Sequence, residues 1–321
     1  MSLGKVFVAG HKGMVGSSII RELTQENLCS EIITIDKLKV NLSCQNETLN
    51  FIKFVKPDVI IIAAAKVGGI FANDQFPADF IYENLMIECN LIKAAHSVDV
   101  KSLLFLGSSC IYPKDCPQPI KEEYLLTGKL EPTNEPYAIS KIAGIKMCES
   151  FNRQYKTDFR SVMPCNLYGP GDNYHGLNSH VIPALIKKIH NGKVNNSPYV
   201  EIWGTGNVQR EFLHVDDLAK ACCFILKISK KKFLEIVPER CSHINVGTSE
   251  EIYIKKLATE IADVIGYEGE FKYDKNKPDG VKRKVLDTNL IRSLGWKPSY
   301  SLKQGIKNTY ASSKLLEEKI I

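Results

Sequence analysis

The sequence predicts an α/β fold: a doubly wound parallel sheet of the Rossmann type, joined to a smaller, interleaved C-terminal domain. Short aliphatic runs alternate with stretches of helical periodicity through the first half of the chain. These runs are continuously apolar, which is typical of parallel strands buried on both faces. A glycine-rich segment separates the first run from the first helical stretch, where such folds turn from strand into helix.

Each element of the sheet follows from one of these runs. Strands are expected at residues 6–9, 32–35, 59–63, 103–106 and 160–163. Between them, apolar residues at helical spacing predict helices at 14–24, 48–55, 78–97 and 137–155. Right-handed crossovers through such helices make the strands parallel.

The pattern changes after Pro164. Residues 166–178 are rich in Gly, Asn and Pro, the composition of an irregular loop that can shape a site. Later segments, at 216–228 and 243–246, are candidates to rejoin the sheet. We therefore expect one domain over 1–165, rejoined by segments near 213–247, and a second domain made mainly from 166–321.

The composition excludes several classes of protein. Among 321 residues, 42 are basic and 36 are acidic, so the net charge of +6 is too mild for a nucleic-acid arm or a polybasic anchor. The surplus suits a small anionic substrate, although a solvated surface explains it equally well. The apolar runs, such as 59–65, are too short to span a bilayer, and the N-terminus lacks the apolar stretch of a signal peptide.

The cysteines point in the same direction. All ten are scattered without the paired spacing of a zinc site, so no metal is expected. Most are interpreted as reduced thiols in the core. The sequence therefore predicts a cytoplasmic protein that binds neither nucleic acid nor membrane.

Residues 10–16, GHKGMVG, form the glycine-rich turn after the first strand. Gly10, Gly13 and Gly16 permit a tight turn and let backbone amides approach a pyrophosphate, which the helix N-terminus stabilises. Three glycines alone would be a weak signal, but their position after a buried N-terminal strand strengthens it. The first domain is therefore predicted to bind a dinucleotide, and the second mainly a substrate.

The residues alone do not decide between NAD and NADP. Asp36 is expected to end the second strand, where an acid binds a ribose hydroxyl and repels a 2′-phosphate. Lys12 lies in the glycine turn and Lys37 follows the acid, and either could neutralise that phosphate. Equally, Lys37 and Lys39 could simply solvate a loop.

A serine, a tyrosine and a lysine suggest catalysis on a carbonyl. Tyr137 and Lys141 are one helical turn apart on the same face of the expected helix. Because an ammonium favours the phenolate, the lysine is expected to lower the pKa of the tyrosine. Ser108 and Ser109 follow the strand at 103–106, at the sheet edge where ligands bind.

With these motifs the chain resembles the extended short-chain dehydrogenases/reductases that act on nucleotide sugars. The resemblance covers nearly the whole chain and includes the GxxGxxG spacing of the glycine turn. Its motifs are GHKGMVG at 10–16, AAAKVGGI at 63–70, GSSCIYP at 107–113, EPTNEPY at 131–137, NSHVIP at 178–183, REFLHVDD at 210–217 and KPDG at 277–280. Cys110 and the pair Ser179–His180 narrow it to the members that both epimerise and reduce a GDP-sugar.

The resemblance implies a reaction. A homodimer would convert GDP-4-keto-6-deoxy-D-mannose to GDP-L-fucose with NADPH, by 3,5-epimerisation followed by reduction of the 4-keto group. Cys110 would be the base and His180 the acid of the epimerisation. Ser108 and Tyr137 would stabilise the charge on the C4 oxygen, and Tyr137 would protonate it during reduction. Lys141 would bind the nicotinamide ribose.

The resemblance also implies two sets of binding residues. Those for NADP(H) are Gly10, His11, Lys12, Gly13, Met14, Val15, Gly16, Lys37, Leu106, Gly107, Ser108, Ser109, Lys141, Pro164, Cys165, Asn166, Leu167 and His180. Those for the GDP-sugar are Lys188, Trp203, Arg210 and Asp279. Lys12 and Lys188 stand where the bacterial members carry arginine.

Several alternatives stay open. Cys110 could be an ordinary buried thiol, His180 could cap a helix starting near Val181, and Trp203 could be a core aromatic. The chain could be another nucleotide-sugar epimerase or a dehydratase, although a 4-epimerase needs no Cys110–His180 pair and a dehydratase would carry an acid at Cys110. A non-catalytic dinucleotide-binding regulator is a further alternative, but such proteins tend to lose the tyrosine or the lysine.

Overall fold

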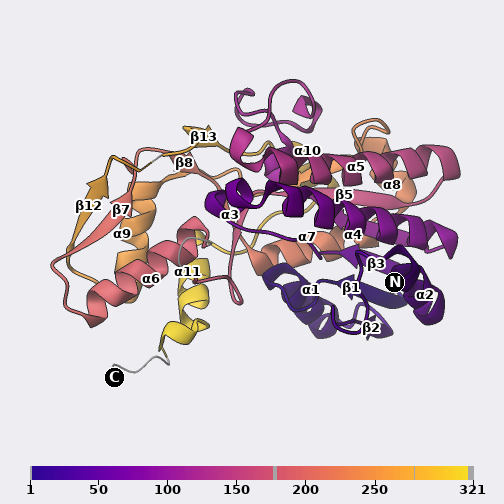
Figure 1. Ribbon diagram of the computed structural model, residues 1–321, viewed down its shortest axis with the longest axis horizontal. Coiled ribbons are helices and arrows are strands. Elements are labelled where there is room, and N and C mark those ends of the chain that lie inside the picture. Colours follow the sequence, from indigo (N-terminus) through magenta and orange to yellow (C-terminus); the bar gives the residue numbers. More distant parts are fainter. Residues whose placement is uncertain (1, 176–178, 278, 317–321) are drawn as a thin grey trace.

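The computed structural model describes residues 2–175, 179–277 and 279–316, and it confirms the doubly wound fold (Figure 1). Its main sheet has six strands in the order β10-β5-β4-β3-β1-β2, and all neighbours are parallel. The strands are β1 (Lys5–Ala9), β2 (Glu31–Ile33), β3 (Val59–Ile62), β4 (Ser102–Leu106), β5 (Phe159–Pro164) and β10 (His243–Val246). Every residue of β3, β5 and β10 is buried, which explains the continuous apolar run of β3, while β5 and β10 also bury polar side chains such as Arg160 and Asn245.

Helices lie on both sides of this sheet (Figure 1). On one side α1 (Met14–Gln25) packs against α7 (Val215–Lys227). On the other side α4 (Pro77–Ser97) packs against α5 (Glu135–Tyr155), and α4 also contacts α2 (Gln45–Val55). The α4–α5 contact matters for the site because it brings buried side chains of both helices together.

Two local expectations need correction. The strand predicted at 32–35 ends at Ile33, so Asp36 lies beyond β2 rather than at its end. Its carbonyl oxygen accepts from the backbone N–H of Lys39 and of Val40, at 2.9 and 3.1 Å, and this turn terminates the extended chain. In addition, no helix was expected after the motif at 63–70, where α3 (Ile70–Gln75) begins at the last residue of the motif.

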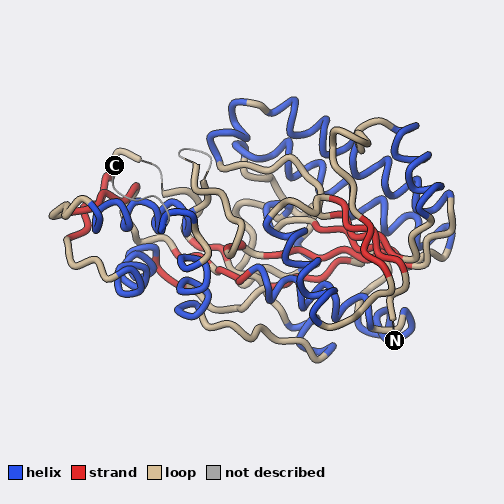
Figure 2. The backbone as a smooth tube through the Cα atoms, turned by 90° about the horizontal axis from the view of Figure 1, so that it is seen from below, coloured by secondary structure: helices blue, strands red, loops and turns tan. Residues whose placement is uncertain are grey.

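The remaining elements form a smaller lobe and several connections (Figure 2). In that lobe β7 (Tyr199–Trp203) pairs with β12 (Glu270–Asp274), and β8 (Gln209–Arg210) lies between β11 (Ile252–Tyr253) and β13 (Arg283–Lys284). β6 (Asn166–Tyr168) pairs with β9 (Phe212–His214). The other helices are α6 (Val181–Val194), α8 (Lys230–Ile236), α9 (Ile254–Ile265), α10 (Asn289–Leu294), α11 (Leu302–Ala311), and the 3-10 turns η1 (Ser109–Ile111), η2 (Glu122–Tyr124), η3 (Pro132–Asn134) and η5 (Lys314–Leu316).

Buried apolar side chains form two separate clusters. The larger surrounds the six-stranded sheet and contains residues such as Ile60 and Phe105. The smaller contains Ile186, Leu257 and Ile306, from α6, α9 and α11. Because β10 joins the main sheet only after the chain has formed β7 and β8, the two clusters are built from an interleaved chain.

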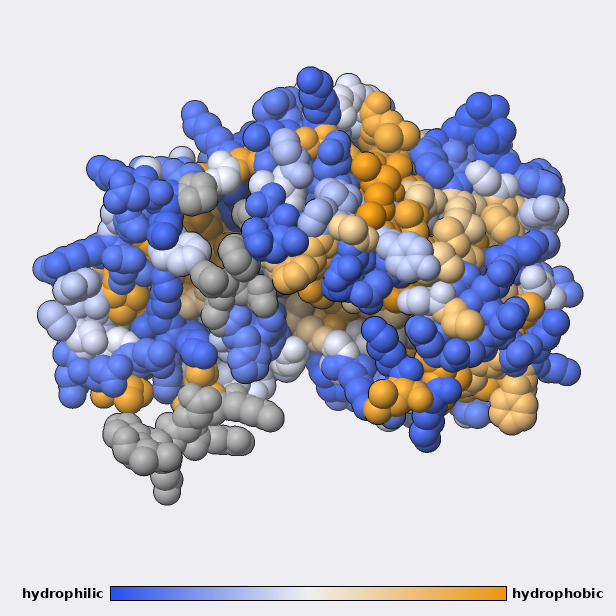
Figure 3. Space-filling model, viewed as in Figure 1, coloured by the Kyte–Doolittle hydropathy of each residue, from blue (hydrophilic) through white to orange (hydrophobic). Residues whose placement is uncertain are grey.

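The surface seen in Figure 3 is largely hydrophilic, with apolar side chains gathered over the region of α4 and α5. Tyr82 on α4 and Ile139 on α5 are exposed. Within the described residues, no helix combines the length and the hydrophobicity that a membrane crossing requires.

Candidate active site

The glycine turn is shaped for a close ligand. Gly10 has φ +86°, and a Cβ there would lie 2.6 Å from the backbone nitrogen of Ala64. A Cβ at Gly16 would collide with the carbonyl of Gly10. Helix α1 begins at Met14 without a side-chain cap and without an acidic residue in its first turn. Its first amides can therefore bind an anion, so the predicted residues 10–16 fit a dinucleotide pyrophosphate.

The carboxylate of Asp36, which follows β2, is paired with cationic side chains. Asp36 pairs with Lys12 at 2.5 Å and with His11 at 3.5 Å. The hydrogen bond from Lys12 is the largest cause that lowers the pKa of Asp36 below its ordinary value. Lys37 extends into solvent, with Nζ 3.6 Å from Glu83. Because Lys12 offsets the charge of Asp36 and Lys37 lies next to it in the chain, the end of β2 is compatible with a 2′-phosphate.

The other predicted cofactor residues lie at the carboxyl ends of β4 and β5. Leu106 ends β4, and Gly107 donates its N–H to the carbonyl of Val162 at 2.9 Å. Cys165 donates its N–H to the carbonyl of Val246 at 3.0 Å, which holds the end of β5 against β10. Further residues of this edge are Ser109, which is buried in η1, and Pro164, Asn166 and Leu167 around the junction of β5 and β6.

Ser108 is the hydroxyl around which the expected catalytic groups gather. It follows β4, and its hydroxyl lies beside the side chains of both Tyr137 and Cys110, where it acts to lower the pKa of each. It also accepts from the N–H of Cys110 at 3.4 Å, which fixes the start of η1. The sheet edge and helix α5 therefore place a phenol and a thiol on one shared hydroxyl.

Lys141 lies beneath this group with an ionic partner that the sequence analysis missed. Its Nζ is 5.8 Å from the centre of the Tyr137 ring and 4.8 Å from that of Phe105. Nζ donates to Glu88 Oε1 on α4 at 2.7 Å, and the two side chains are 2% and 1% exposed. Burial raises the pKa of Glu88, while the ammonium of Lys141 acts to lower it. Glu88 Oε2 has no hydrogen-bond partner.

The pKa of Tyr137 differs from the expectation. Lys141 was expected to lower it, but it lies well above the ordinary value of 10.0. Burial is the largest cause, followed by Cys110 and by the carboxylate of Glu88, while the hydrogen bond with Ser108 opposes them. Because Lys141 is paired with Glu88, the ammonium does not act alone on the phenol.

Cys110 and His180 both rest in their neutral forms. Cys110 is 9% exposed. Burial raises its pKa, although Lys284, Ser108 and Lys141 act in the opposite direction. His180 occupies the N-cap position of α6 but makes no side-chain capping bond, so the capping alternative is wrong. Its side chain reaches solvent, yet desolvation lowers the pKa of its imidazole.

The expected substrate residues lie together on the smaller lobe. Trp203 ends β7 and is 47% exposed, so it is not a core aromatic. Lys188 Nζ lies 5.0 Å from the centre of its ring and donates to the carbonyl of Glu201 at 3.1 Å. The ammonium and the indole thus form an open polar and aromatic surface.

Arg210 and Asp279 form the second half of this surface. Arg210, on β8, donates to the carbonyl of Gln209 at 2.8 Å and to that of Asp279 at 3.4 Å. The carboxylate of Asp279 accepts from the N–H and the hydroxyl of Thr205, at 2.7 and 2.8 Å. Asp279 therefore fixes the loop beside Trp203 and orients Arg210. Asn178 and Pro278, which belong to two of the motifs, lie outside the described residues.

Two residues near the catalytic groups were missed. Lys284, on β13, lowers the pKa of Cys110, yet in the sequence it looks like one member of a basic run at 282–284. Glu88 shares its buried helix face with Phe80, Asn84 and Ala95. An acid at a core position of a helix was the available signal, because such a group requires a buried partner.

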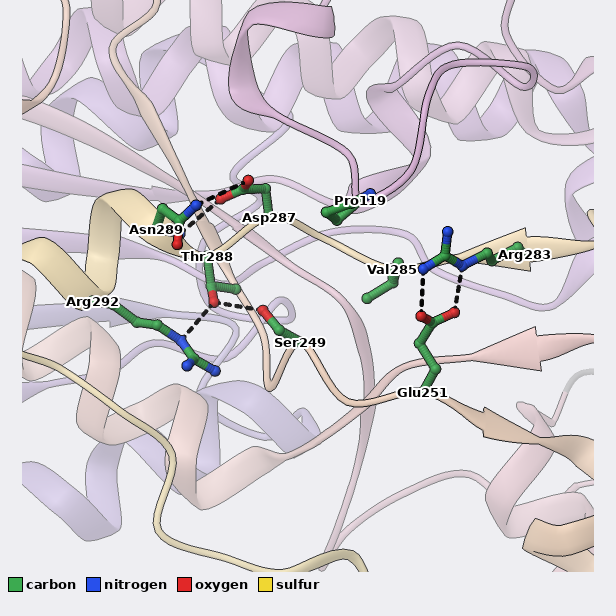
Figure 4. A pocket seen from close by; sticks show the side chains of 9 residues that line it. All are labelled: Pro119, Ser249, Glu251, Arg283, Val285, Asp287, Thr288, Asn289 and Arg292. Atoms are coloured by element: carbon green, nitrogen blue, oxygen red, sulfur yellow. Dashed lines mark hydrogen bonds and ion pairs between the residues drawn. The ribbon is translucent and has the colours of Figure 1, made fainter.

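A separate surface cavity of about 260 Å³ lies beside β13 and α10 (Figure 4). Figure 4 shows that Arg283 and Glu251, which line the cavity, are joined by two hydrogen bonds from the guanidinium group to the carboxylate. Thr288 contacts Ser249 and Arg292 at its other end. No predicted catalytic residue lines this cavity, and its charged side chains are either ion-paired or hydrogen-bonded to neighbours, so it does not extend the site around Ser108.

The sequence of this chain is similar to one protein family and to named relatives. A family model described as the NAD dependent epimerase/dehydratase family matches residues 6–247. The GDP-L-fucose synthase of Escherichia coli (strain K12) is 53% identical over 310 residues, covering 97% of this chain and 96% of that protein. GDP-L-fucose synthase 1 of Arabidopsis thaliana is 50% identical, covering 95% and 92%.

A solved structure gives the same result in three dimensions. The GDP-mannoheptose C4 reductase from Campylobacter jejuni, with NADP bound, has a TM-score of 0.88 to this chain at 35% identity. The match covers 97% of this chain and 99% of that one. The likeness therefore includes the smaller lobe as well as the six-stranded sheet.

Proposed function

This chain belongs to the NAD dependent epimerase/dehydratase family, and on that premise we propose that it converts GDP-4-keto-6-deoxy-D-mannose to GDP-L-fucose with NADPH. The observation that carries the proposal is the position of the Ser108 hydroxyl, which lies beside both Tyr137 and Cys110 and accepts from the backbone N–H of Cys110 at 3.4 Å. A phenol suited to reduction and a thiol suited to epimerisation thereby serve one carbonyl.

Epimerisation starts from the acidity of the carbons beside the C4 ketone. Removal of the proton at C3 or C5 gives an enolate whose charge is on the C4 oxygen, and Ser108 and Tyr137 donate hydrogen bonds to it. Cys110 takes the proton from one ring face and His180 returns a proton to the other. The neutral thiol of Cys110 and the neutral imidazole of His180 together carry the same number of protons as a thiolate and an imidazolium ion. The resting pair therefore needs only an internal proton transfer to become reactive.

Reduction uses the same oxygen. Bound NADPH supplies the hydride to C4, and Tyr137 gives its phenolic proton to the C4 oxygen as that oxygen becomes an alcohol. A proton donor must be protonated before the step, and the raised pKa of Tyr137 meets that requirement at neutral pH. Lys141 keeps a positive charge beneath the phenol and binds the nicotinamide ribose.

The cofactor binds to the lobe that contains the six-stranded sheet, and the GDP-sugar binds to the smaller lobe. The amides of 10–16 hold the pyrophosphate, Lys12 and Lys37 neutralise the 2′-phosphate, and the ends of β4 and β5 contact the nicotinamide half. On the smaller lobe, Arg210 binds the diphosphate through its forked donors, and Lys188 adds a second charge. Trp203 offers its exposed ring to the base or sugar.

We further propose that the protein is a cytoplasmic homodimer. The apolar side chains over α4 and α5 (Figure 3) would be buried against the same face of a second copy, and α4 and α5 also carry the exposed residues Tyr82 and Ile139. All ten cysteines are free thiols, which suits a reducing compartment. Replacement of Tyr82 by lysine should shift the mass in sedimentation towards the monomer, and an unchanged mass would refute this interface.

One experiment tests the function. The purified protein is mixed with GDP-4-keto-6-deoxy-D-mannose and either NADPH or NADH, oxidation of the nicotinamide is followed, and the sugar is identified. The proposal requires faster oxidation of NADPH and a product inverted at C3 and C5. An alcohol formed without inversion would instead identify a simple C4 reductase, and absence of oxidation would reject the reductase function.

A further inference from the structure

Resting on the function proposed above, we propose that Glu88 is a positioning residue that keeps Tyr137 protonated for reduction by neutralising the charge of Lys141. A reductase needs a phenol that can give up a proton, whereas an unopposed ammonium beneath the ring favours the phenolate. Glu88 offsets that ammonium from the other side. The helix α4 would thus contribute a residue that controls the catalytic tyrosine without touching the substrate.

The geometry of the pair supports this assignment. Lys141 Nζ and Glu88 Oε1 are 2.7 Å apart, and both side chains are almost completely buried between α4 and α5. Charges enclosed in this way act strongly on their neighbours, because little water screens them. Nζ lies 5.8 Å from the centre of the Tyr137 ring, and the charge of Glu88 is one of the causes that raise the pKa of the phenol.

The other groups around Tyr137 do not replace Glu88. Ser108 hydrogen-bonds to the phenol but carries no charge, and Phe80 of α4 packs its ring edge-to-face at 6.4 Å. Cys110 has a raised pKa and is a thiol at neutral pH, with Lys284 as its nearby cation. The charges that act directly beneath the phenol are therefore those of Lys141 and Glu88, and the Glu88 carboxylate contributes to the raised pKa of Tyr137.

The incomplete bonding of Glu88 favours a functional rather than a stabilising role. Its Oε2 is buried and has no partner, although buried carboxylates are normally satisfied. An ion pair in the core adds little to stability because desolvation of both groups is costly. A hydrophobic pair would fill the same space between two packed helices. A hydrophobic pair, however, could not control the charge near Tyr137.

The test compares pH profiles of reduction in single turnovers. Glu88→Gln keeps an oxygen that accepts from Lys141 but removes the negative charge. The ammonium then acts alone, the pKa of Tyr137 falls, and the alkaline limb of NADPH oxidation moves to lower pH by about 1–2 units. At a pH where Tyr137 remains protonated, deuterium exchange at C3 and C5 should stay within about twofold of the unmodified enzyme.

A matched control is available on the same helix as Lys141. Glu149 is a nearly buried carboxylate that pairs with Lys146 at 2.9 Å, two helical turns beyond Lys141. Glu149→Gln removes a comparable charge away from Tyr137, so its alkaline limb should coincide with that of the unmodified enzyme. A shift equal to that of Glu88→Gln would show that the effect is not specific to the pair.

A double variant shows whether the shift in Glu88→Gln requires the ammonium of Lys141. Glu88→Gln with Lys141→Gln removes both charges, so its limb should return to the unmodified position, although its rate is lower. Coincident limbs for Glu88→Gln and the unmodified enzyme, or a displaced limb for the double variant, would overturn the inference. If the unmodified enzyme neither exchanges nor reduces the sugar, the proposed function fails instead, which distinguishes the two outcomes.

Discussion

The pH dependence of hydrogen exchange at C3 and C5 reports on whether Cys110 and His180 act as a base and acid pair. Burial raises the pKa of Cys110 above its ordinary 9.0, and desolvation lowers the pKa of His180 below its ordinary 6.5. The fraction of enzyme with thiolate and imidazolium depends on the difference between the two pKa values. Because the pKa of Cys110 lies above that of His180, only a small minority of the enzyme holds the reactive form.

This fraction does not change with pH between the two pKa values, so inversion at C3 and C5 in the unmodified enzyme should show a plateau. It falls below the pKa of His180, where the added proton leaves the thiol unionised, and above the pKa of Cys110, where the imidazolium is lost. In His180→Asn the thiolate alone determines the rate. Exchange should then rise about tenfold per pH unit up to the pKa of Cys110, without inversion of the carbons.

The assay needs no reductant. Each enzyme is incubated with the keto sugar in deuterated buffers between about pH 6 and 9, and deuterium at C3 and C5 is measured by NMR. His175→Asn is the control, because His175 is an exposed histidine in the preceding loop. With the configuration of both carbons read from the same spectra, a flat exchange profile in His180→Asn, or a slope of one for inversion in the unmodified enzyme, would contradict the assignment of the pair.

Three further variants test separate parts of the site. Tyr137→Phe should lower the rate of NADPH oxidation by about 10²–10⁴, measured by absorbance, and near-normal turnover would exclude Tyr137 as the proton donor. Cys110→Ser should retain carbonyl reduction while losing solvent deuterium exchange at C3 and C5; undiminished exchange would refute its role as the base. Gly10→Ala should weaken NADPH binding in a titration, because φ is +86° and the added Cβ meets Ala64; an unchanged dissociation constant would show that the turn is not built for close approach.

The parts of the site that local patterns predict are those built from neighbouring residues. Tyr137 and Lys141 are one helical turn apart, and residues 10–16 form a single strand-to-helix turn. Buried strands such as β3 were predicted because every residue in them is apolar. In each case the information lies within a few residues, so spacing alone defines the geometry.

The parts that escaped prediction depend on distant partners. Glu88 and Lys141 are 53 positions apart, and only the packing of α4 on α5 brings them together. The direction of the pKa shift at Tyr137 was wrong mainly because burial of the phenol in the folded chain raises its pKa, with Cys110 and Glu88 adding to the effect. Asp36 was placed at the end of a strand that stops at Ile33, because strand ends are set by backbone hydrogen bonds.

Strand β10 is synthesised long after its partner β5, and this order affects folding during biosynthesis. Residues 243–246 pair with β5, which leaves the ribosome some eighty residues earlier. Until then β5 is an open edge with unpaired amides and carbonyls, a template for pairing with another nascent chain. A fragment cut after residue 165 would keep that edge permanently, so it should aggregate even though it contains the complete glycine turn.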